Sequence, residues 1–200
     1  MARALVTGAT GLVGSHIVEH LLGASWRVRA LVRSSGNGEP SPTRAWDGVA
    51  WLRSKDVELS FGDVLDLPAF AEAARGCDVI FHTAATVVTR GRGVHAYDAY
   101  RAPNVDGTRN AISAAERTGA RLLHLSSVAV YGPHARYESP IDEHVKRLPV
   151  SETTPLRPLP DRAYYARSKR ESEDLVLRAH SDGRVWATAV RPDVIYGPRD

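Results

Sequence analysis

The 200-residue sequence predicts an α/β fold, a doubly wound (Rossmann) parallel sheet with helices on both faces. Short apolar runs alternate with longer segments of helical periodicity, as in a parallel sheet covered by helices. A glycine-rich turn at positions 7–14 joins the first apolar run to the first helical segment. Because 200 residues can bury one good core but not two full-sized ones, we expect a single domain over residues 1–200 that binds NAD(P) and carries the catalytic residues.

Six apolar runs predict the strands, and their spacing leaves room for a covering helix between most of them. Parallel strands joined in this way form a doubly wound sheet, with ligands at the carboxyl ends of the strands. The predicted strands are Ala4–Val6, Val28–Val32, Val57–Ser60, Asp78–His82, Arg121–Leu125 and Val185–Val190.

Three segments have the 3.6-residue periodicity of amphipathic helices: Leu12–Leu22, Gly107–Thr118 and Ala163–Arg178. Gly23 is a suitable stop for the first. The remaining long segments are irregular. Residues 34–54, rich in Gly, Pro and Ser, predict a surface loop with room for a short helix. Residues 86–97 hold two glycines and predict a mobile loop, and the five prolines of residues 134–162 predict an ordered loop.

Composition excludes several classes of protein. The 26 basic and 23 acidic residues leave a net charge of +3, and the arginines are scattered, so we expect no nucleic-acid partner. Cys77 is the only cysteine, which rules out an internal disulfide and a cysteine metal cage; we expect a buried, inert thiol and no metal. Without a long apolar run or an apolar signal core, the expectation is a soluble cytoplasmic protein with no membrane partner.

The turn Thr7-Gly8-Ala9-Thr10-Gly11-Leu12-Val13-Gly14 predicts a dinucleotide site. Gly8 permits the sharp turn, Gly11 lets the backbone approach a pyrophosphate, and Gly14 lets the helix pack tightly. Free N–H groups and the helix dipole would then hold the anion, with Thr7, Thr10, Leu12 and Val13 completing the cradle. The alternative is a glycine-rich turn without a ligand, which the combination of strand, spacing and helix makes the weaker interpretation.

The G-x-x-G-x-x-G spacing of TGATGLVG resembles the fingerprint of the extended short-chain dehydrogenases/reductases, which include UDP-galactose epimerase, dihydroflavonol reductase and 3β-hydroxysteroid dehydrogenase. The resemblance covers essentially the whole chain, with five motifs in the family's order. It implies hydride transfer between a nicotinamide and a carbon that bears a hydroxyl or keto oxygen. Members of the family usually continue for about a hundred further residues that form a substrate lobe, so we expect that lobe to be largely absent from this chain.

The end of the second strand favours NADP(H) over NAD(H). NAD sites place an acidic residue there, whereas this sequence has Val32 followed by Arg33. A guanidinium suits a 2′-phosphate by charge and by geometry, and Ser34 and Ser35 could add hydroxyl donors. The alternative is that Arg33 is a solvated charge at a strand end. The string VRALVR resembles NADP-preferring members of the family.

The resemblance also assigns further cofactor contacts. It implies that Asp63 bonds the adenine amine and that Val64 packs on the ring, although Asp63 alone would be a turn residue. It places the small-residue motif of His82, Ala84 and Ala85 beside the adenosine ribose, although a histidine there is more often a packed strand-end residue. The last motif, R-P-x-x-V-Y-G-P, places two further residues beside the nicotinamide: Pro192 and Val194.

Tyr165 and Lys169 lie four residues apart and therefore on one helical face. A nearby ammonium would lower the pKa of the phenol by favouring the phenolate, and the lysine could also bond the nicotinamide ribose. The adjacent Tyr164 has Ser168 at the same spacing, which cannot supply the charge. A Y-x-x-x-K motif is weak alone, but its order after the glycine turn and a serine-ended strand strengthens it.

Ser127 and Asn104 complete the predicted catalytic group. Ser127, four residues before Tyr131 in the string S-S-x-x-V-Y-G, would bond the substrate oxygen while Tyr165 passes a proton. Ser126 is the runner-up, and a capping or turn role is the alternative for either serine. Asn104, in the family's N-V-x-G-T-x-N segment, would support the lysine and an ordered water, or act as a helix N-cap.

The predicted function is an NADP(H)-dependent oxidoreductase acting on a ketone or secondary alcohol. The first alternative is a sugar-nucleotide epimerase. A 4,6-dehydratase is less favoured, because those enzymes place Asp-Glu after the catalytic hydroxyl residue, whereas Val128 follows Ser127. The second alternative is a non-catalytic NADP(H) sensor, which would not need to retain Ser127, Tyr165 and Lys169 together. By analogy with the family we expect a homodimer formed through the helices that carry Asn104 and Tyr165.

Overall fold

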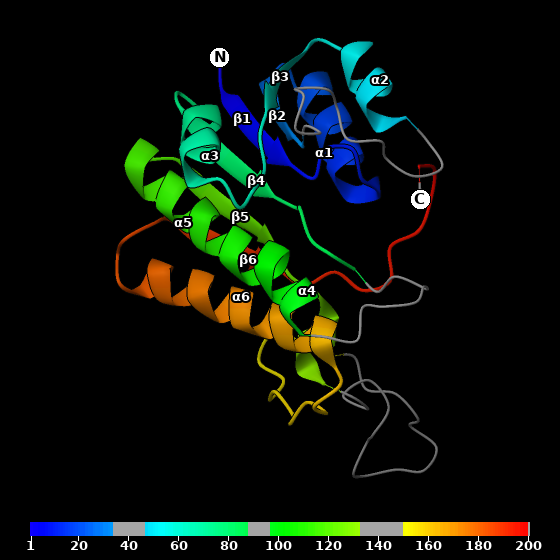
Figure 1. Cartoon of the computed structure of the whole chain (residues 1–200), viewed down its shortest axis with the longest axis vertical. Coiled ribbons are helices and arrows are strands. Elements are labelled where there is room, and N and C mark those ends of the chain that lie inside the picture. Colours follow the sequence, from blue (N-terminus) through cyan, green and yellow to red (C-terminus); the bar gives the residue numbers. More distant parts are fainter. Residues whose placement is uncertain (34–46, 88–96, 133–149, 200) are drawn as a thin grey trace.

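The computed structural model describes residues 1–33, 47–87, 97–132 and 150–199. In these residues the strands form one parallel sheet in the order β3-β2-β1-β4-β5-β6 (Figure 1). The chain order reverses between β1 and β4, and ligands bind at such a switch point in doubly wound sheets. The strands are β1 (Arg3–Thr7), β2 (Arg27–Val32), β3 (Val57–Phe61), β4 (Val79–His82), β5 (Arg121–Leu125) and β6 (Ala187–Val190).

Helices cover both faces of the sheet, as predicted (Figure 1). Alternate residues of β1 belong to two apolar cores, because neighbouring side chains of a strand point to opposite faces. Ala4 and Val6 pack in the core under α1 and α2, whereas Leu5 packs in the core under α3, α5 and α6. The helices are α1 (Leu12–Gly23), α2 (Gly48–Arg53), α3 (Leu67–Ala74), α4 (Asp98–Arg101), α5 (Gly107–Thr118) and α6 (Tyr164–Ser181), with a π-helical turn η1 (Ala102–Asp106) and a 3-10 turn η2 (Val128–Tyr131).

The predicted strands and helices are confirmed with small changes at their ends. Helix α6 runs three residues beyond the predicted Arg178, and β6 begins at Ala187 because the Val185 N–H bonds the Ala179 carbonyl at the end of that helix. The short helix expected within residues 34–54 is α2, and residues 150–162 lie outside helices and strands, as expected. The mobility predicted for 86–97 falls mostly outside the described residues, as do Ser34 and Ser35.

Two helical segments were not predicted. Helix α3 begins where the Asp66 side chain accepts a hydrogen bond from the Ala69 N–H, with Pro68 in its first turn. The helix that carries Asn104 starts at Asp98, and η1 joins α4 to α5 without a break. Pro103 lacks an N–H, so the regular ladder of helical hydrogen bonds cannot continue through it, and the chain widens into a π-turn. Asn104 therefore lies inside a helical run, and its predicted alternative role as an N-cap is wrong.

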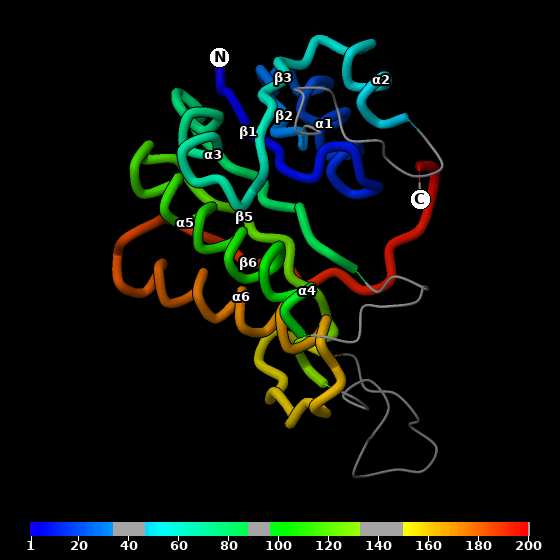
Figure 2. Tube along the Cα trace, viewed as in Figure 1, coloured from blue at the N-terminus to red at the C-terminus, as the bar shows by residue number. Residues whose placement is uncertain are grey.

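Figure 2 follows the chain from β1 to β4, which pair in register although they lie about 75 residues apart in the sequence. This pairing places the ends of β1 and β4 side by side, next to the start of α1. No helix in the described ranges is long and apolar enough to cross a membrane. Cys77 is buried, its thiol contacts the Ala73 carbonyl, and burial raises its pKa, as an inert thiol requires.

Candidate active site at the carboxyl ends of the strands

The turn between β1 and α1 can be made only by glycine at two of its positions. Gly8 has a φ of +70°, and a Cβ there would lie 2.8 Å from the Ala84 nitrogen. A Cβ on Gly14 would lie 2.2 Å from the Gly8 carbonyl oxygen. Gly14 thus brings α1 against the turn itself, a tighter contact than the helix-to-sheet packing predicted. The turn is closed by a hydrogen bond of 2.9 Å from the Gly11 N–H to the Gly8 carbonyl.

The start of α1 offers unpaired N–H groups to a ligand. Gly11 occupies the N-cap position, no side chain caps the helix, and the first turn has no acidic residue. The predicted contact residues Thr10, Leu12 and Val13 are half-buried along this edge. Free N–H groups and the positive end of the helix dipole bind anions. The cradle therefore fits the pyrophosphate of a dinucleotide.

The buried side chains of Thr7 and His82 lie next to each other behind this turn. The Thr7 hydroxyl lies 2.9 Å from His82 Nδ1 and accepts a hydrogen bond of 3.3 Å from the Ala84 N–H. Both side chains are essentially fully buried, and His82 is a packed strand-end residue; the cofactor contacts predicted for Thr7 and His82 remain predictions. Ala84 and Ala85 follow it and remain half-buried at the edge of the turn, where the cofactor contact predicted for them remains a prediction.

The residues predicted to contact the adenosine half of the cofactor differ in how exposed their side chains are. Val32 is buried at the end of β2, whereas Arg33 is exposed and has no ion pair among the described residues. Asp63 accepts a hydrogen bond of 2.9 Å from the Leu65 N–H, as the turn alternative predicted. Val64 is buried and faces Gly107 of α5. The cofactor contacts of Arg33, Asp63 and Val64 remain predictions.

Ser127 and Tyr165 meet beyond the end of β5. Ser127 caps η2, where its hydroxyl accepts a hydrogen bond of 3.2 Å from the Ala129 N–H, and it lies near enough to Tyr165 to lower the pKa of that phenol. Both side chains are half-buried, so a small molecule can reach them. The runner-up, Ser126, is buried with its hydroxyl unpaired. Tyr164 packs instead near the rings of Tyr97 and Tyr100.

Lys169 is buried one helical turn after Tyr165. Its ammonium donates a hydrogen bond of 2.7 Å to the Leu125 carbonyl at the end of β5, and burial lowers its pKa to about 8. Burial raises the pKa of Tyr165, and the nearby Ser127 opposes that rise only partly. The pKa of the phenol is therefore raised on balance, because burial of the ring outweighs the groups that would lower it; the lowering effect predicted for Lys169 remains a prediction.

Both ends of the Asn104 side-chain amide form hydrogen bonds. Its side-chain oxygen accepts a hydrogen bond of 2.7 Å from the Thr86 N–H, and its amide donates to the Thr86 carbonyl at 3.0 Å and to the Ser168 hydroxyl at 2.9 Å. Asn104 thus ties η1 to the segment after β4 and to the residue beside Lys169. The predicted support of the lysine is indirect, through the position of α6.

The segment after β6 lies against the segment that carries Ser127. The Pro192 carbonyl accepts a hydrogen bond of 3.0 Å from the Val128 N–H, and Pro192 is half-buried. Val194 is three-quarters exposed, and the nicotinamide contacts of Pro192 and Val194 remain predictions. Sequence reasoning gave no role to Tyr131 or Arg191, although both stand in the motifs it used. In the structure the two residues are hydrogen-bonded to each other.

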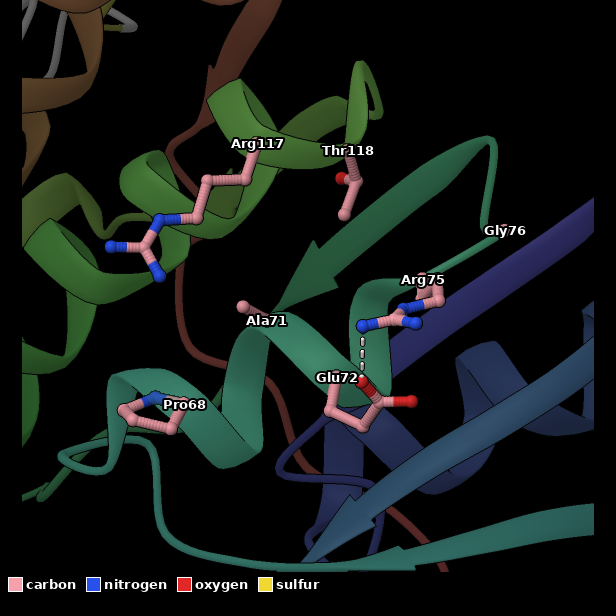
Figure 3. Close-up of a pocket in the computed structure, with 7 residues that line it drawn as sticks. All are labelled: Pro68, Ala71, Glu72, Arg75, Gly76, Arg117 and Thr118. Atoms are coloured by element: carbon pink, nitrogen blue, oxygen red, sulfur yellow. Dashed lines mark ion pairs between the residues drawn. The ribbon is translucent and has the colours of Figure 1, made fainter.

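A hollow of about 610 Å³ lies at the other edge of the sheet, between α3 and α5 (Figure 3). Its wall includes Arg117 and the ion pair of Glu72 with Arg75, whose charged atoms lie 2.7 Å apart. None of the predicted site residues lines it. The described residues contain no cluster of side chains suited to a metal ion.

A six-stranded doubly wound sheet with a glycine cradle at its switch point and a Ser-Tyr-Lys group beside it defines a class of nucleotide-dependent oxidoreductase folds. The chain belongs to the NAD dependent epimerase/dehydratase family, which it matches over residues 4–200. This confirms the resemblance to the extended short-chain dehydrogenases/reductases.

Individual relatives carry different activities in their names. The chain is 35% identical over 199 residues to sterol demethylase protein B of Methylococcus capsulatus, covering 98% of this chain and 52% of that protein. It is 31% identical over 195 residues to ceramide reductase of Caulobacter vibrioides, covering 98% and 47%. The solved structure of the dTDP-glucose 4,6-dehydratase DesIV of Streptomyces venezuelae, which has NAD bound, superposes with a TM-score of 0.77 at 28% identity, covering 98% and 57%. The chain thus spans about half the length of these relatives.

Proposed function

We propose that the protein is an NADP(H)-dependent oxidoreductase that reduces a ketone to a secondary alcohol or catalyses the reverse reaction. The observation that carries the proposal is that Ser127, which follows β5, and the α6 residues Tyr165 and Lys169 gather at the end of β5, where the Lys169 ammonium bonds the Leu125 carbonyl, at the same edge of the sheet as the glycine cradle. The reductase names among the relatives support it.

The cradle residues would hold the pyrophosphate at the start of α1, and Arg33 would pair with the 2′-phosphate that distinguishes NADP from NAD. A bound nicotinamide would supply or accept the hydride. Ser127 would donate a hydrogen bond to the substrate oxygen, and Tyr165 Oη would deliver a proton to it. With its pKa raised by burial, the Tyr165 phenol is protonated at neutral pH, which is the state that can donate a proton when a ketone is reduced.

A sugar-nucleotide epimerase is the second candidate, supported by membership of the NAD dependent epimerase/dehydratase family. Such an enzyme would use the same Tyr165 and Lys169 but would regenerate its cofactor within each turnover. By family analogy we also propose a homodimer built on α5 and α6, which lie side by side on one face of the sheet (Figure 1).

NADPH fluorescence titration followed by a turnover screen with ketones and UDP-sugars tests the function. We expect binding, net NADPH oxidation with a ketone, and a loss of turnover of about 10²- to 10⁴-fold in Tyr165→Phe with NADPH affinity retained. Tyr164→Phe, the neighbouring phenol, is the matched control and should keep its activity.

Exchange at a sugar carbon without net NADPH consumption would establish the epimerase instead. Tight binding without turnover in the natural full-length protein would favour a sensor. Full activity of Tyr165→Phe would refute the role given to Tyr165.

A further inference from the structure

Glu173 is a buried carboxylate on the same face of α6 as Lys169, one turn further on. Only 3% of its surface is exposed. The Arg191 guanidinium forms a hydrogen-bonded ion pair with it. Nε lies 3.1 and 3.0 Å from the two carboxylate oxygens, and Nη2 lies 2.6 Å from one of them. Such a fork-shaped pair fixes the orientation of both side chains as well as their distance.

The same arginine reaches the segment that carries Ser127. Arg191 Nη1 donates a hydrogen bond of 2.6 Å to the Tyr131 hydroxyl, which in turn donates at 2.8 Å to the Ser151 carbonyl. Tyr131 ends η2, which Ser127 begins. Glu173 and Lys169 lie on the same helix. The contacts of Arg191 with Glu173 and Tyr131 therefore connect the helix that carries the lysine to η2, the turn that Ser127 caps (the Ser127 turn), and to the start of the segment after β6.

Glu173 also acts on the charge of Lys169. Burial lowers the pKa of Lys169 to about 8, and the Glu173 carboxylate opposes that fall. Without the carboxylate, the lysine would lose its proton closer to neutral pH.

Within the part of the chain that the structure describes, Glu173 is the only anion that acts on the pKa of Lys169. His82 of β4 and His124 of β5 are buried, and their lowered pKa values keep both imidazoles neutral. From η1 and α5, Asn104 is uncharged and Asp106 is paired with Arg101 and Arg109. The titratable groups on the elements packed against this part of α6 also include the phenols of Tyr100 and Tyr131, beside Tyr165 of α6 itself, and two cations, Arg170 and Arg191.

We propose that Glu173 is a positioning residue for Lys169: its buried carboxylate keeps the lysine positively charged, while its ion pair with Arg191 holds α6 in place against the Ser127 turn. The proposal rests on the catalytic group assigned above. It predicts that the lysine is charged at neutral pH because of a carboxylate that touches neither substrate nor cofactor.

The chain has only three lysines, Lys55, Lys146 and Lys169, so their ε-¹³C NMR signals can be followed separately through a pH titration. A Lys169→Arg variant identifies the Lys169 signal by its loss. We expect the signal of Lys169 to titrate near pH 8 in the unaltered protein, and the midpoint to fall by about one pH unit or more in Glu173→Gln. Glu173→Asp keeps the carboxylate and should restore the midpoint.

Asp174→Asn is the matched control, since Asp174 neighbours Glu173 but is exposed and paired with Arg178; it should leave the midpoint unchanged. If Glu173→Gln fails to fold, Glu173→Leu combined with Arg191→Met replaces the whole pair with apolar side chains, which proteins often tolerate, and should show a smaller fall in the same direction, because a cation is lost with the carboxylate.

An unchanged midpoint in the variants that lack the carboxylate would overturn the proposal and leave the pair a purely structural contact. This titration needs no cofactor. Failure to bind NADPH would therefore count against the proposed function alone, and a fixed midpoint against Glu173 alone.

Discussion

At the scale of single residues, burial decides the protonation states in the site. Burial raises the pKa of the Tyr165 phenol and lowers the pKa of the Lys169 ammonium, which is almost fully desolvated, to about 8. Below about pH 8 the pair is a neutral phenol beside a cation. That is the state required to donate a proton to an oxygen that is gaining negative charge.

Arg33 gives the sharpest prediction at this scale. Replacing it with aspartate removes the proposed partner of the 2′-phosphate and supplies an acceptor for a ribose hydroxyl. We expect NADPH to bind about 10- to 100-fold more weakly, because a hydrogen bond to a charged group contributes about 1.5–3 kcal/mol, and the preference to shift toward NADH. Fluorescence titration with both cofactors measures this.

Arg117→Asp makes the same change of charge at the opposite edge of the sheet, beside the hollow of Figure 3, and controls for net charge. Equal ratios of NADPH to NADH affinity in Arg33→Asp and the parent protein would remove Arg33 from the site.

The sequence motifs predicted where most of the site residues lie, but not how deeply each side chain is buried or how its pKa is shifted. Ser127, Tyr165 and Lys169 come together as their order in the sequence indicated. The burial of His82 was not predictable from its motif, because the environment of a strand residue depends on its neighbours in the sheet, here Thr7 of the adjacent strand. The raised pKa of Tyr165 was not predictable, because spacing along a helix says nothing about desolvation.

At the scale of elements, the position of α1 depends on one missing side chain. A Cβ on Gly14 would lie 2.2 Å from a backbone oxygen of the turn, so Gly14→Ala must push the helix away from the cradle. We expect a loss of about 1–3 kcal/mol in the free energy of unfolding, as for other overpacked sites, together with weaker NADPH binding. Urea unfolding and cofactor titration measure the two effects.

Gly23→Ala is the matched control on the same helix, since a Cβ there meets nothing within 4 Å. It should leave binding unchanged and stability equal or slightly higher, because alanine has the better helix propensity. A Gly14→Ala protein as stable as the Gly23→Ala protein would contradict the tight contact.

The elements that sequence reasoning missed are short or irregular. Helix α3 carries its own start signals, Asp66 and Pro68, but is too short for a clear periodicity. The π-turn η1 depends on how α4 and α5 both pack against α6. Pro103 therefore predicts that the regular helix is interrupted, but not that the interruption is a π-turn. Long amphipathic helices and buried strands, by contrast, were predicted to within a few residues because their patterns are long.

At the scale of the whole molecule, the order of the strands places the site. Parallel strands that alternate with helices leave few topologies, and the observed reversal between β1 and β4 sets the glycine cradle at the carboxyl edge of the sheet, where Ser127 follows β5. The choice of substrate is not predictable from this arrangement, since a doubly wound sheet hosts many reactions.

The central claim is that this edge holds a dinucleotide with its reactive ring beside Tyr165. A crystal structure of the protein with NADPH tests it most directly. The account predicts the pyrophosphate at the start of α1, the 2′-phosphate beside Arg33, and the nicotinamide next to the Tyr165 hydroxyl. A groove without the dinucleotide at saturating NADPH, or a nicotinamide ring remote from Tyr165, would contradict it.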